Sequence, residues 1–142
     1  MIKLIVGKKG KGKTKCLLEN VNEAVKSAEG NVVFVDKNKK HMFELDKKVR
    51  LINITEFPVK NADAFVGFIC GIVSQDHDLE QVYIDAFLKT AYLEEKDIAM
   101  IENVIEELDA LSTGYDVDIC ISLSLDETEV PETLKEKILI AL

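Results

Sequence analysis

The chain has 142 residues, of which 47% are hydrophobic, and its formal net charge at pH 7 is -8. This size suits one compact unit with one core, so we expect residues 1–142 to form a single domain. The acidic charge opposes nonspecific binding to nucleic acid or to an anionic membrane. No apolar stretch approaches the roughly 20 residues needed to span a bilayer. The composition therefore predicts a soluble protein with no nucleic-acid partner and no membrane insertion.

The cysteine pattern indicates a reducing compartment. Cys16, Cys70 and Cys120 are odd in number, lie far apart and are flanked by apolar residues, which is typical of buried thiols and not of a disulfide or zinc site. The apolar start, residues 1–6, is too short for a signal peptide. We therefore expect a cytoplasmic location.

The first elements form a strand, helix and strand unit. Ile2 to Val6 is an apolar, β-branched run of the kind found in strands buried on both faces. From Lys13 the apolar residues recur at helical spacing. Asn31 to Asp36 is a second buried strand, so the three elements have the size of a βαβ unit.

The next segment is polar and rich in lysine. Within residues 37–48, Met42 to Leu45 is more apolar, and we expect it to form a short hairpin strand against Val49 to Ile54. Asn61 is placed to cap a helix that covers Ala62 to Ser74, whose apolar character predicts a core helix.

The remaining elements continue the alternation. Gln81 to Asp85 is a strand that ends in a carboxylate. Acidic residues from Glu94 to Asp97 favour a helix N-terminus, and helical spacing continues to Gly114. Val117 to Leu125 is the last predicted strand, and residues 131–138 are predicted to form a short terminal helix that begins at a proline.

The order of elements predicts the fold class. Strands that alternate with helices form a three-layer αβα sandwich with a mostly parallel sheet. Ligands of such sheets lie at the carboxyl ends of the strands, so residues that follow strands can act together.

The segment between the first strand and the first helix carries a phosphate-binding motif. It fits G-x-x-x-x-G-K-[ST] at every fixed position. The glycines allow the backbone to form a concave nest of N–H groups, and the helix N-terminus adds partial positive charge. The predicted nucleotide-binding residues, including the lysine after the motif, are Gly7, Lys8, Lys9, Gly10, Lys11, Gly12, Lys13, Thr14 and Lys15.

By this motif the chain resembles the P-loop NTPases, and specifically the small RecA-like ATP-binding proteins. The resemblance implies that Lys13 reaches the β- and γ-phosphates of ATP and that the Thr14 hydroxyl is a ligand of Mg²⁺. The strand Val82-Tyr83-Ile84-Asp85 resembles a Walker B strand, which implies that Asp85 helps to hold the magnesium. Lys13 and Asp85 are the predicted catalytic residues, and ATP and Mg²⁺ are the predicted cofactors.

The chain departs from vigorous ATPases of this class at the position of the catalytic base. Such enzymes usually have Glu directly after the Walker B Asp, whereas this chain has Ala86. Glu94, Glu95 and Asp126 are the other acidic residues considered for that role. Ser122-Leu123-Ser124 resembles a sensor strand, although two solvent-facing serines would give the same pattern.

The supply of arginine also argues against fast chemistry. Arg50 is the only arginine among eighteen basic residues, and its predicted place at the start of a strand is the wrong edge of the sheet. P-loop kinases and self-sufficient motor ATPases use arginines to stabilise the transferring phosphoryl group. We therefore expect slow turnover by this chain alone.

Three other polar patterns are interpreted as structural. Asp76-His77-Asp78 precedes a strand and is expected to be a polar turn at the amino edge of the sheet. His41 has no neighbouring acid or thiol in the sequence and is expected to be solvated. Asn38-Lys39-Lys40-His41 lacks the final Asp of a guanine-specificity motif, which disfavours GTP.

Three functions remain open on the sequence. The first is a slow or partner-dependent Mg-ATPase. The second is a protein-binding module in which ATP orders residues 37–48 for a protein partner or a second copy of the chain, without significant turnover. The third is a small phosphotransferase that resembles nucleoside kinases, although no lid or set of arginines is evident.

Overall fold

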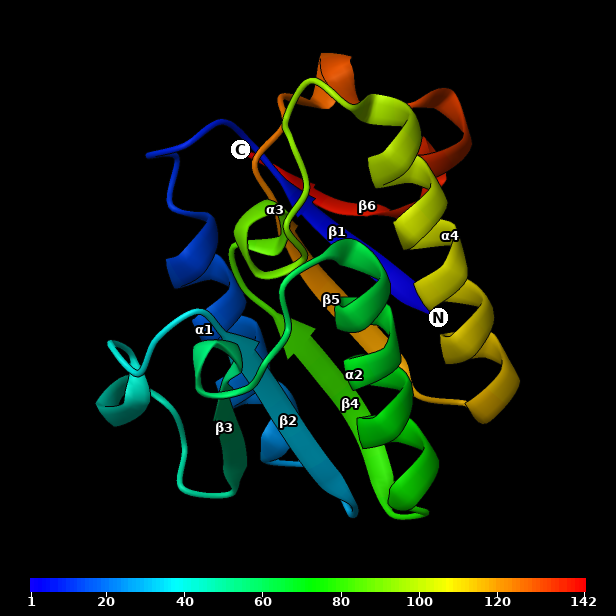
Figure 1. The fold of residues 1–142 in the computed structure, drawn as a ribbon. Coiled ribbons are helices and arrows are strands. Elements are labelled where there is room, and N and C mark those ends of the chain that lie inside the picture. The colour runs from blue at the N-terminus through cyan, green and yellow to red at the C-terminus, as the bar shows by residue number, and fades with distance from the viewer.

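The protein is a three-layer αβα sandwich, seen in a computed structural model that describes residues 1–142 (Figure 1). Its central sheet has six strands, all parallel, in the order β3-β2-β4-β5-β1-β6. The expected αβα sandwich with a parallel sheet is therefore confirmed. The strands are β1 (Ile2–Val6), β2 (Asn31–Asp36), β3 (Val49–Asn53), β4 (Leu79–Ile84), β5 (Asp118–Leu123) and β6 (Ile138–Ala141).

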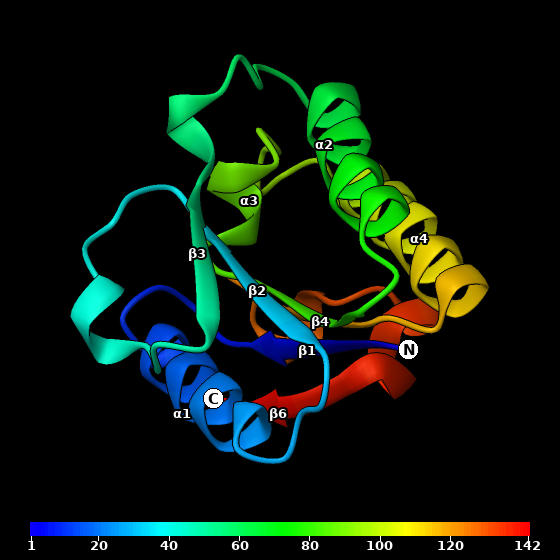
Figure 2. The same cartoon turned by 90° about the horizontal axis from the view of Figure 1, so that it is seen from below.

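Helices cover the two faces of the sheet unequally. Helices α2 and α4 pack side by side on one face, whereas α1 alone covers the other (Figure 2). The four α-helices are α1 (Lys13–Val25), α2 (Ala62–Gln75), α3 (Phe87–Thr90) and α4 (Ile98–Tyr115). Four short 3₁₀ segments connect them: η1 (Met42–Glu44), η2 (Ile54–Glu56), η3 (Glu127–Glu129) and η4 (Glu132–Lys137).

The hydrophobic core is divided just as unequally between the two faces of the sheet. Twenty-six buried apolar residues form the cluster beneath α2 and α4, and ten form the cluster beneath α1. Strand residues alternate between the two clusters, as side chains on a pleated strand must. In β4, for example, Val82 and Ile84 belong to the larger cluster and Tyr83 to the smaller one. The face beneath α1 therefore has less apolar cover and leaves room for polar groups at its edge.

The expected hairpin at residues 42–54 is wrong. Met42–Glu44 is a 3₁₀ turn, and Val49–Asn53 is an edge strand that pairs in parallel with β2. Leu45 is the only buried residue of the expected first strand, and it packs into the cluster beneath α1. A single inward side chain cannot specify a half-buried strand, because a strand needs alternate residues facing the core.

The expected terminal helix is also wrong. Pro131 does precede helical turns, but these are of the 3₁₀ type and end at Lys137. Residues 138–141 then form β6, which pairs in parallel with β1 at the edge of the sheet. Only about half of the strand's side chains are partly buried, so its pattern in the sequence is that of a short amphipathic helix as much as that of an edge strand.

Two further expectations concern membrane insertion and the state of the three cysteines. None of the helices combines the length and the apolar character that a membrane crossing requires. Cys16, Cys70 and Cys120 are all free and half-buried. Burial raises the pKa of Cys16 and raises that of Cys120 to about 12, so neither is an activated thiolate.

Candidate functional site

The phosphate loop, Gly7 to Thr14, connects β1 to α1 and includes the first two residues of that helix, and its backbone has the conformation that an anion nest requires. Gly10 and Gly12 have φ angles of +87° and +90°, in the region that favours glycine. No side chain caps the N-terminus of α1. The N–H groups of its first turn therefore remain available to an anion, and the helix dipole adds positive charge there.

Lys13 and Thr14 extend from this loop toward the sheet. The Lys13 ammonium is buried and its Nζ donates a hydrogen bond to the carbonyl oxygen of Lys8 at 3.0 Å. Burial lowers the pKa of Lys13, and the negative charge of Asp85 opposes that shift. The Thr14 hydroxyl lies 3.0 Å from Oδ2 and 3.2 Å from Oδ1 of Asp85. The two residues expected to hold magnesium are thus in direct contact.

Asp85 is held by the neighbouring strand. The hydroxyl of Ser122 donates to Oδ1 of Asp85 at 2.6 Å and accepts a hydrogen bond from the backbone N–H of Ala86 at 2.8 Å. Ser122 therefore positions the Asp85 carboxylate, which is 4% exposed. The sequence pattern allows Ser122 to be either a sensor residue or a solvent-facing serine; the structure buries it and turns it toward the site.

The register of the sheet explains why these groups meet. Phe34 pairs with Tyr83, and Tyr83 pairs with Cys120, so these three residues face the α1 side in one row. Side chains two residues later along each strand face the same side. That next row consists of Asp36, Asp85 and Ser122.

A cavity of about 770 Å³ opens at this edge of the sheet. Of the predicted binding residues, seven line it: Lys8, Lys9, Gly10, Gly12, Lys13, Thr14 and Asp85. Gly7 is buried in the loop, Lys11 is exposed outside the lining, and Lys15 lines an adjacent cavity of about 420 Å³. The structure thus brings most of the predicted nucleotide site together.

Two lysines that the sequence analysis did not single out also line the cavity. Lys37 follows β2 and Lys89 lies on α3, so both come from outside the phosphate loop. Their side chains are close enough that Lys37 lowers the pKa of Lys89. Their pairing depends on the fold, because they lie 52 positions apart in the sequence.

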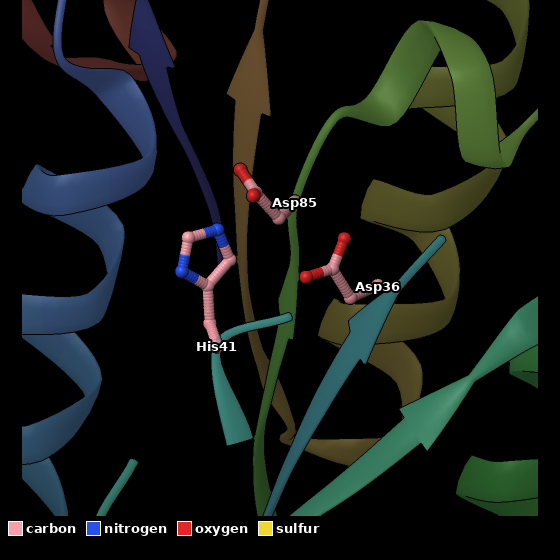
Figure 3. A group of neighbouring side chains, drawn as sticks. All are labelled: Asp36, His41 and Asp85. Atoms are coloured by element: carbon pink, nitrogen blue, oxygen red, sulfur yellow. The ribbon is translucent and has the colours of Figure 1, made fainter. Parts of the chain in front are cut away.

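Asp36 and His41 lie beside Asp85, and neither was predicted to belong to the site (Figure 3). One ligand atom from each of the three residues lies within 4.8 Å of the others. The expectation that His41 is solvated is wrong: its side chain is 21% exposed and its Nδ1 contacts Glu44 at 2.5 Å. The loop after β2 folds back over the strand ends and carries His41 to the carboxylates.

Asp36 is the most desolvated acid of the site. It is 2% exposed; Oδ1 accepts the Lys37 backbone N–H at 2.7 Å, and Oδ2 has no hydrogen-bond partner. Burial raises its pKa; the Lys37 N–H opposes this shift and Asp85 adds to it. Asp36 ends a buried strand as Asp85 does, and that shared feature is the signal that could have identified it.

The other acidic residues considered as a base divide into two groups. Glu95 lines the cavity, whereas Glu94 lies outside the lining. Asp126 is engaged in a capping box, where it accepts hydrogen bonds from the backbone and hydroxyl of Thr128. Arg50 lies near the amino end of β3 and lines a different cavity, so no arginine reaches the site.

The segment from Asp76 to Asp78 is the polar turn that the sequence predicts. Asp76 accepts hydrogen bonds from the side chain of Asn31 and the backbone N–H of Asp78. The turn precedes β4 and therefore lies at the opposite edge of the sheet from Asp85. His77 is exposed and belongs to no cluster of metal-ligating residues.

The architecture and topology are those of the RecA-like α/β fold, with β5 between the strand that leads into the phosphate loop and the strand that precedes Asp85. Among solved structures, the chain is similar to a KaiC-like protein from the hyperthermophilic archaeon Pyrococcus horikoshii OT3. The TM-score is 0.66 at 16% identity, and the match covers 95% of this chain and 67% of that chain. This likeness establishes the fold. No protein-family model matches the sequence, and no curated protein matches it.

Proposed function

We propose that residues 1–142 act as a single P-loop domain that binds Mg-ATP and hydrolyses it slowly or only with a partner. One observation carries the proposal. The phosphate loop presents Lys13 and Thr14 at a large cavity, and the Thr14 hydroxyl lies 3.0 Å from a buried carboxylate at the end of a parallel strand. Nucleotides bind at this edge in parallel α/β sheets.

The residues present fit the triphosphate. Gly10 and Gly12 hold the positive φ angles that L side chains rarely adopt, open space lies beside both, and the uncapped start of α1 supplies free N–H groups. Lys13 would exchange its hydrogen bond with the Lys8 carbonyl for phosphate oxygens. That exchange replaces a neutral acceptor with a charged one, which strengthens the hydrogen bond.

The residues also fit magnesium. Thr14 supplies a hydroxyl and Asp85 a carboxylate, which are the oxygen ligands that this hard cation prefers. When bound, Mg²⁺ would neutralise charge on the phosphates during transfer. Ser122 would keep Asp85 oriented toward it through the hydrogen bond to Oδ1.

The same geometry supports slow turnover. Ala86, directly after Asp85, adopts a left-handed conformation with φ of 48° and offers no group that could orient water. The cationic groups opposite the loop are lysines, which act as point charges and not as a bidentate fork. We therefore expect binding to be easier to detect than hydrolysis.

The experiment that tests the proposal is a comparison of nucleotides on the purified chain. Calorimetry with Mg-ATP, Mg-GTP and Mg-ADP should give one site, with ATP bound at least as tightly as GTP. ADP formation and phosphate release should both be slow with ATP alone and should not increase when nucleosides are added. ADP formation that a nucleoside accelerates without matching phosphate release would instead favour the phosphotransferase, because the phosphoryl group is then transferred to the nucleoside.

Replacing the metal-facing hydroxyl tests the role of Thr14. We expect Thr14→Ala to weaken ATP binding roughly 10-fold with Mg²⁺ present and much less in EDTA, because the hydroxyl is assigned to the metal and not to phosphate. Calorimetric titrations in both buffers measure the difference. Thr133→Ala is the control, since that exposed threonine lies outside the cavity lining. Equal losses in the two buffers would contradict the role in metal binding.

Lys37 and Lys89 should contribute positive charge to the same anion. We expect the double variant Lys37→Ala/Lys89→Ala to lower Mg-ATP affinity roughly fivefold at low salt and less at high salt, because exposed charges are screened. Lys47→Ala/Lys48→Ala removes two lysines that line a different cavity and is the matched control. Equal affinities of the two double variants at low salt would remove these lysines from the proposed site.

One observation favours the binding-module alternative as well. The segment 37–48 reaches the site through Lys37 and His41, yet Phe43 in the same segment is 92% exposed. Nucleotide at the site could therefore reposition an apolar side chain that a protein partner or a second copy would cover. Tight Mg-ATP binding without any phosphate release would favour this function over the ATPase.

A further inference from the structure

We propose that Asp36, His41 and Asp85 form a binding site for a divalent transition-metal ion, which shares Asp85 with the proposed magnesium site but takes its other two ligands from outside the phosphate loop. The three side chains converge from two strand ends and the loop that follows β2 (Figure 3). The proposal does not rest on nucleotide binding, since its ligands can be tested on the chain alone.

The strongest observation is the unpartnered oxygen of Asp36. Its Oδ2 is buried and accepts no hydrogen bond, while Asp85, a second buried carboxylate, lies beside it. Neither acid takes part in any of the salt bridges of the molecule. Burying two neighbouring carboxylates is costly, Lys13 balances the charge of Asp85 only in part, and a cation between the two acids would lower that cost further.

The second observation is the orientation of His41. Its Nδ1 faces Glu44, while the other ring nitrogen, Nε2, points toward Asp85 (Figure 3). When the Glu44 carboxylate accepts a hydrogen bond from Nδ1–H, the neutral imidazole has its lone pair on Nε2, where a metal ion can bind. This carboxylate-histidine arrangement is the one that orients metal-bound imidazoles in proteins. Glu44 therefore acts as a positioning residue, and His41 as the ligand.

The donor set selects the class of metal. An imidazole nitrogen suits zinc and its first-row neighbours, whereas Mg²⁺ prefers sites composed of oxygen alone. Ligand atoms within 4.8 Å of one another need only a small inward movement to reach bond lengths of roughly 2 Å. The adjacent cavity of about 420 Å³, lined in part by His41 and Glu44, provides a path for the ion.

Calorimetry with Zn²⁺ on the nucleotide-free chain tests the site. We expect one Zn²⁺ per chain, with Mg²⁺ binding much more weakly. His41→Ala should reduce Zn²⁺ affinity on the order of 100-fold, and Glu44→Gln roughly 10-fold, because loss of an orienting partner typically costs 10- to 100-fold. His77→Ala is the matched control: it removes the only other histidine and should leave affinity unchanged.

The outcomes separate this site from the nucleotide site. His41 and Glu44 lie in a surface segment, so their variants should fold, and melting curves check that they do. Lys13→Ala should keep Zn²⁺ binding even where it abolishes Mg-ATP binding. Failure of Zn²⁺ to bind, or equal Zn²⁺ affinity in His41→Ala and His77→Ala, would overturn the metal site and leave the nucleotide proposal untouched. Mg²⁺ binding as tightly as Zn²⁺ would overturn the assignment to a transition metal.

Discussion

Lys13→Ala should reduce the affinity for Mg-ATP roughly 10- to 100-fold, the largest effect on nucleotide binding that we expect from any single change. A hydrogen bond between charged groups contributes about 1.5–3 kcal/mol, and each 1.4 kcal/mol corresponds to a factor of ten in affinity. Lys13 is the buried cation of the loop, and it lines the cavity together with Thr14 and Asp85. Its loss also leaves the negative charge of Asp85 less balanced against the incoming phosphates.

Calorimetry on both proteins measures this effect. Lys47→Ala is the control, because it removes one lysine and so changes the net charge equally, far from the loop. Lys13→Ala also breaks the hydrogen bond to the Lys8 carbonyl, so melting curves are needed to show that the variant remains folded. Equal Mg-ATP affinity in Lys13→Ala and the unaltered protein would remove the main support for the phosphate-binding loop.

The parts of the fold that sequence predicted well are those specified by local pattern. Ile2 to Val6 and Asn31 to Asp36 are continuous apolar runs, and the structure buries nearly all of them. Asn61 caps α2 through its side chain, as predicted, and Asp97 caps α4. In each of these cases the residues that determine the element lie within it.

The errors arise where an element depends on distant residues. β6 is a strand because its backbone pairs with the free edge of β1. Its own four residues do not distinguish a strand from a helical turn. The same holds for β3, whose direction is set by parallel pairing with β2. Local periodicity carries no information about which sheet edge is free.

The site divides in the same way. The phosphate loop is contiguous in the sequence, so one motif predicts all of its residues. Asp85 is predictable because the strand before it resembles a Walker B strand. Asp36 and His41 were missed because only the register of β2 with β4 and the return of the following loop bring them to Asp85. A strand that ends in Asp is common at turns, and the second one gains meaning only when it is adjacent to the first.

Asp85→Asn should separate a nucleotide-metal site from a simple anion nest. If Asp85 faces the metal, its negative charge opposes phosphate when Mg²⁺ is absent and favours the complex when Mg²⁺ is present. We therefore expect the variant to bind Mg-ATP roughly 10-fold more weakly and to bind metal-free ATP equally well or slightly more tightly. The asparagine Oδ1 can still accept the Ser122 hydroxyl, so the local packing should survive.

Titrations with ATP in Mg²⁺ and in EDTA, combined with melting curves, test this prediction against a purely structural role. A structural Asp85 would show lower thermal stability and no difference between the two buffers. The geometry argues for a different result: Asp85 is repelled by the buried Asp36 and attracted by the buried Lys13, so removing its charge changes these two interactions in opposite directions and should leave the melting temperature nearly unchanged. Ser122→Ala provides a second comparison, because it keeps the charge of Asp85 but removes its orienting hydrogen bond. We expect that variant to weaken Mg-ATP binding less than Asp85→Asn does, because losing the carboxylate charge weakens the attraction to Mg²⁺ more than losing the hydrogen bond that orients the carboxylate.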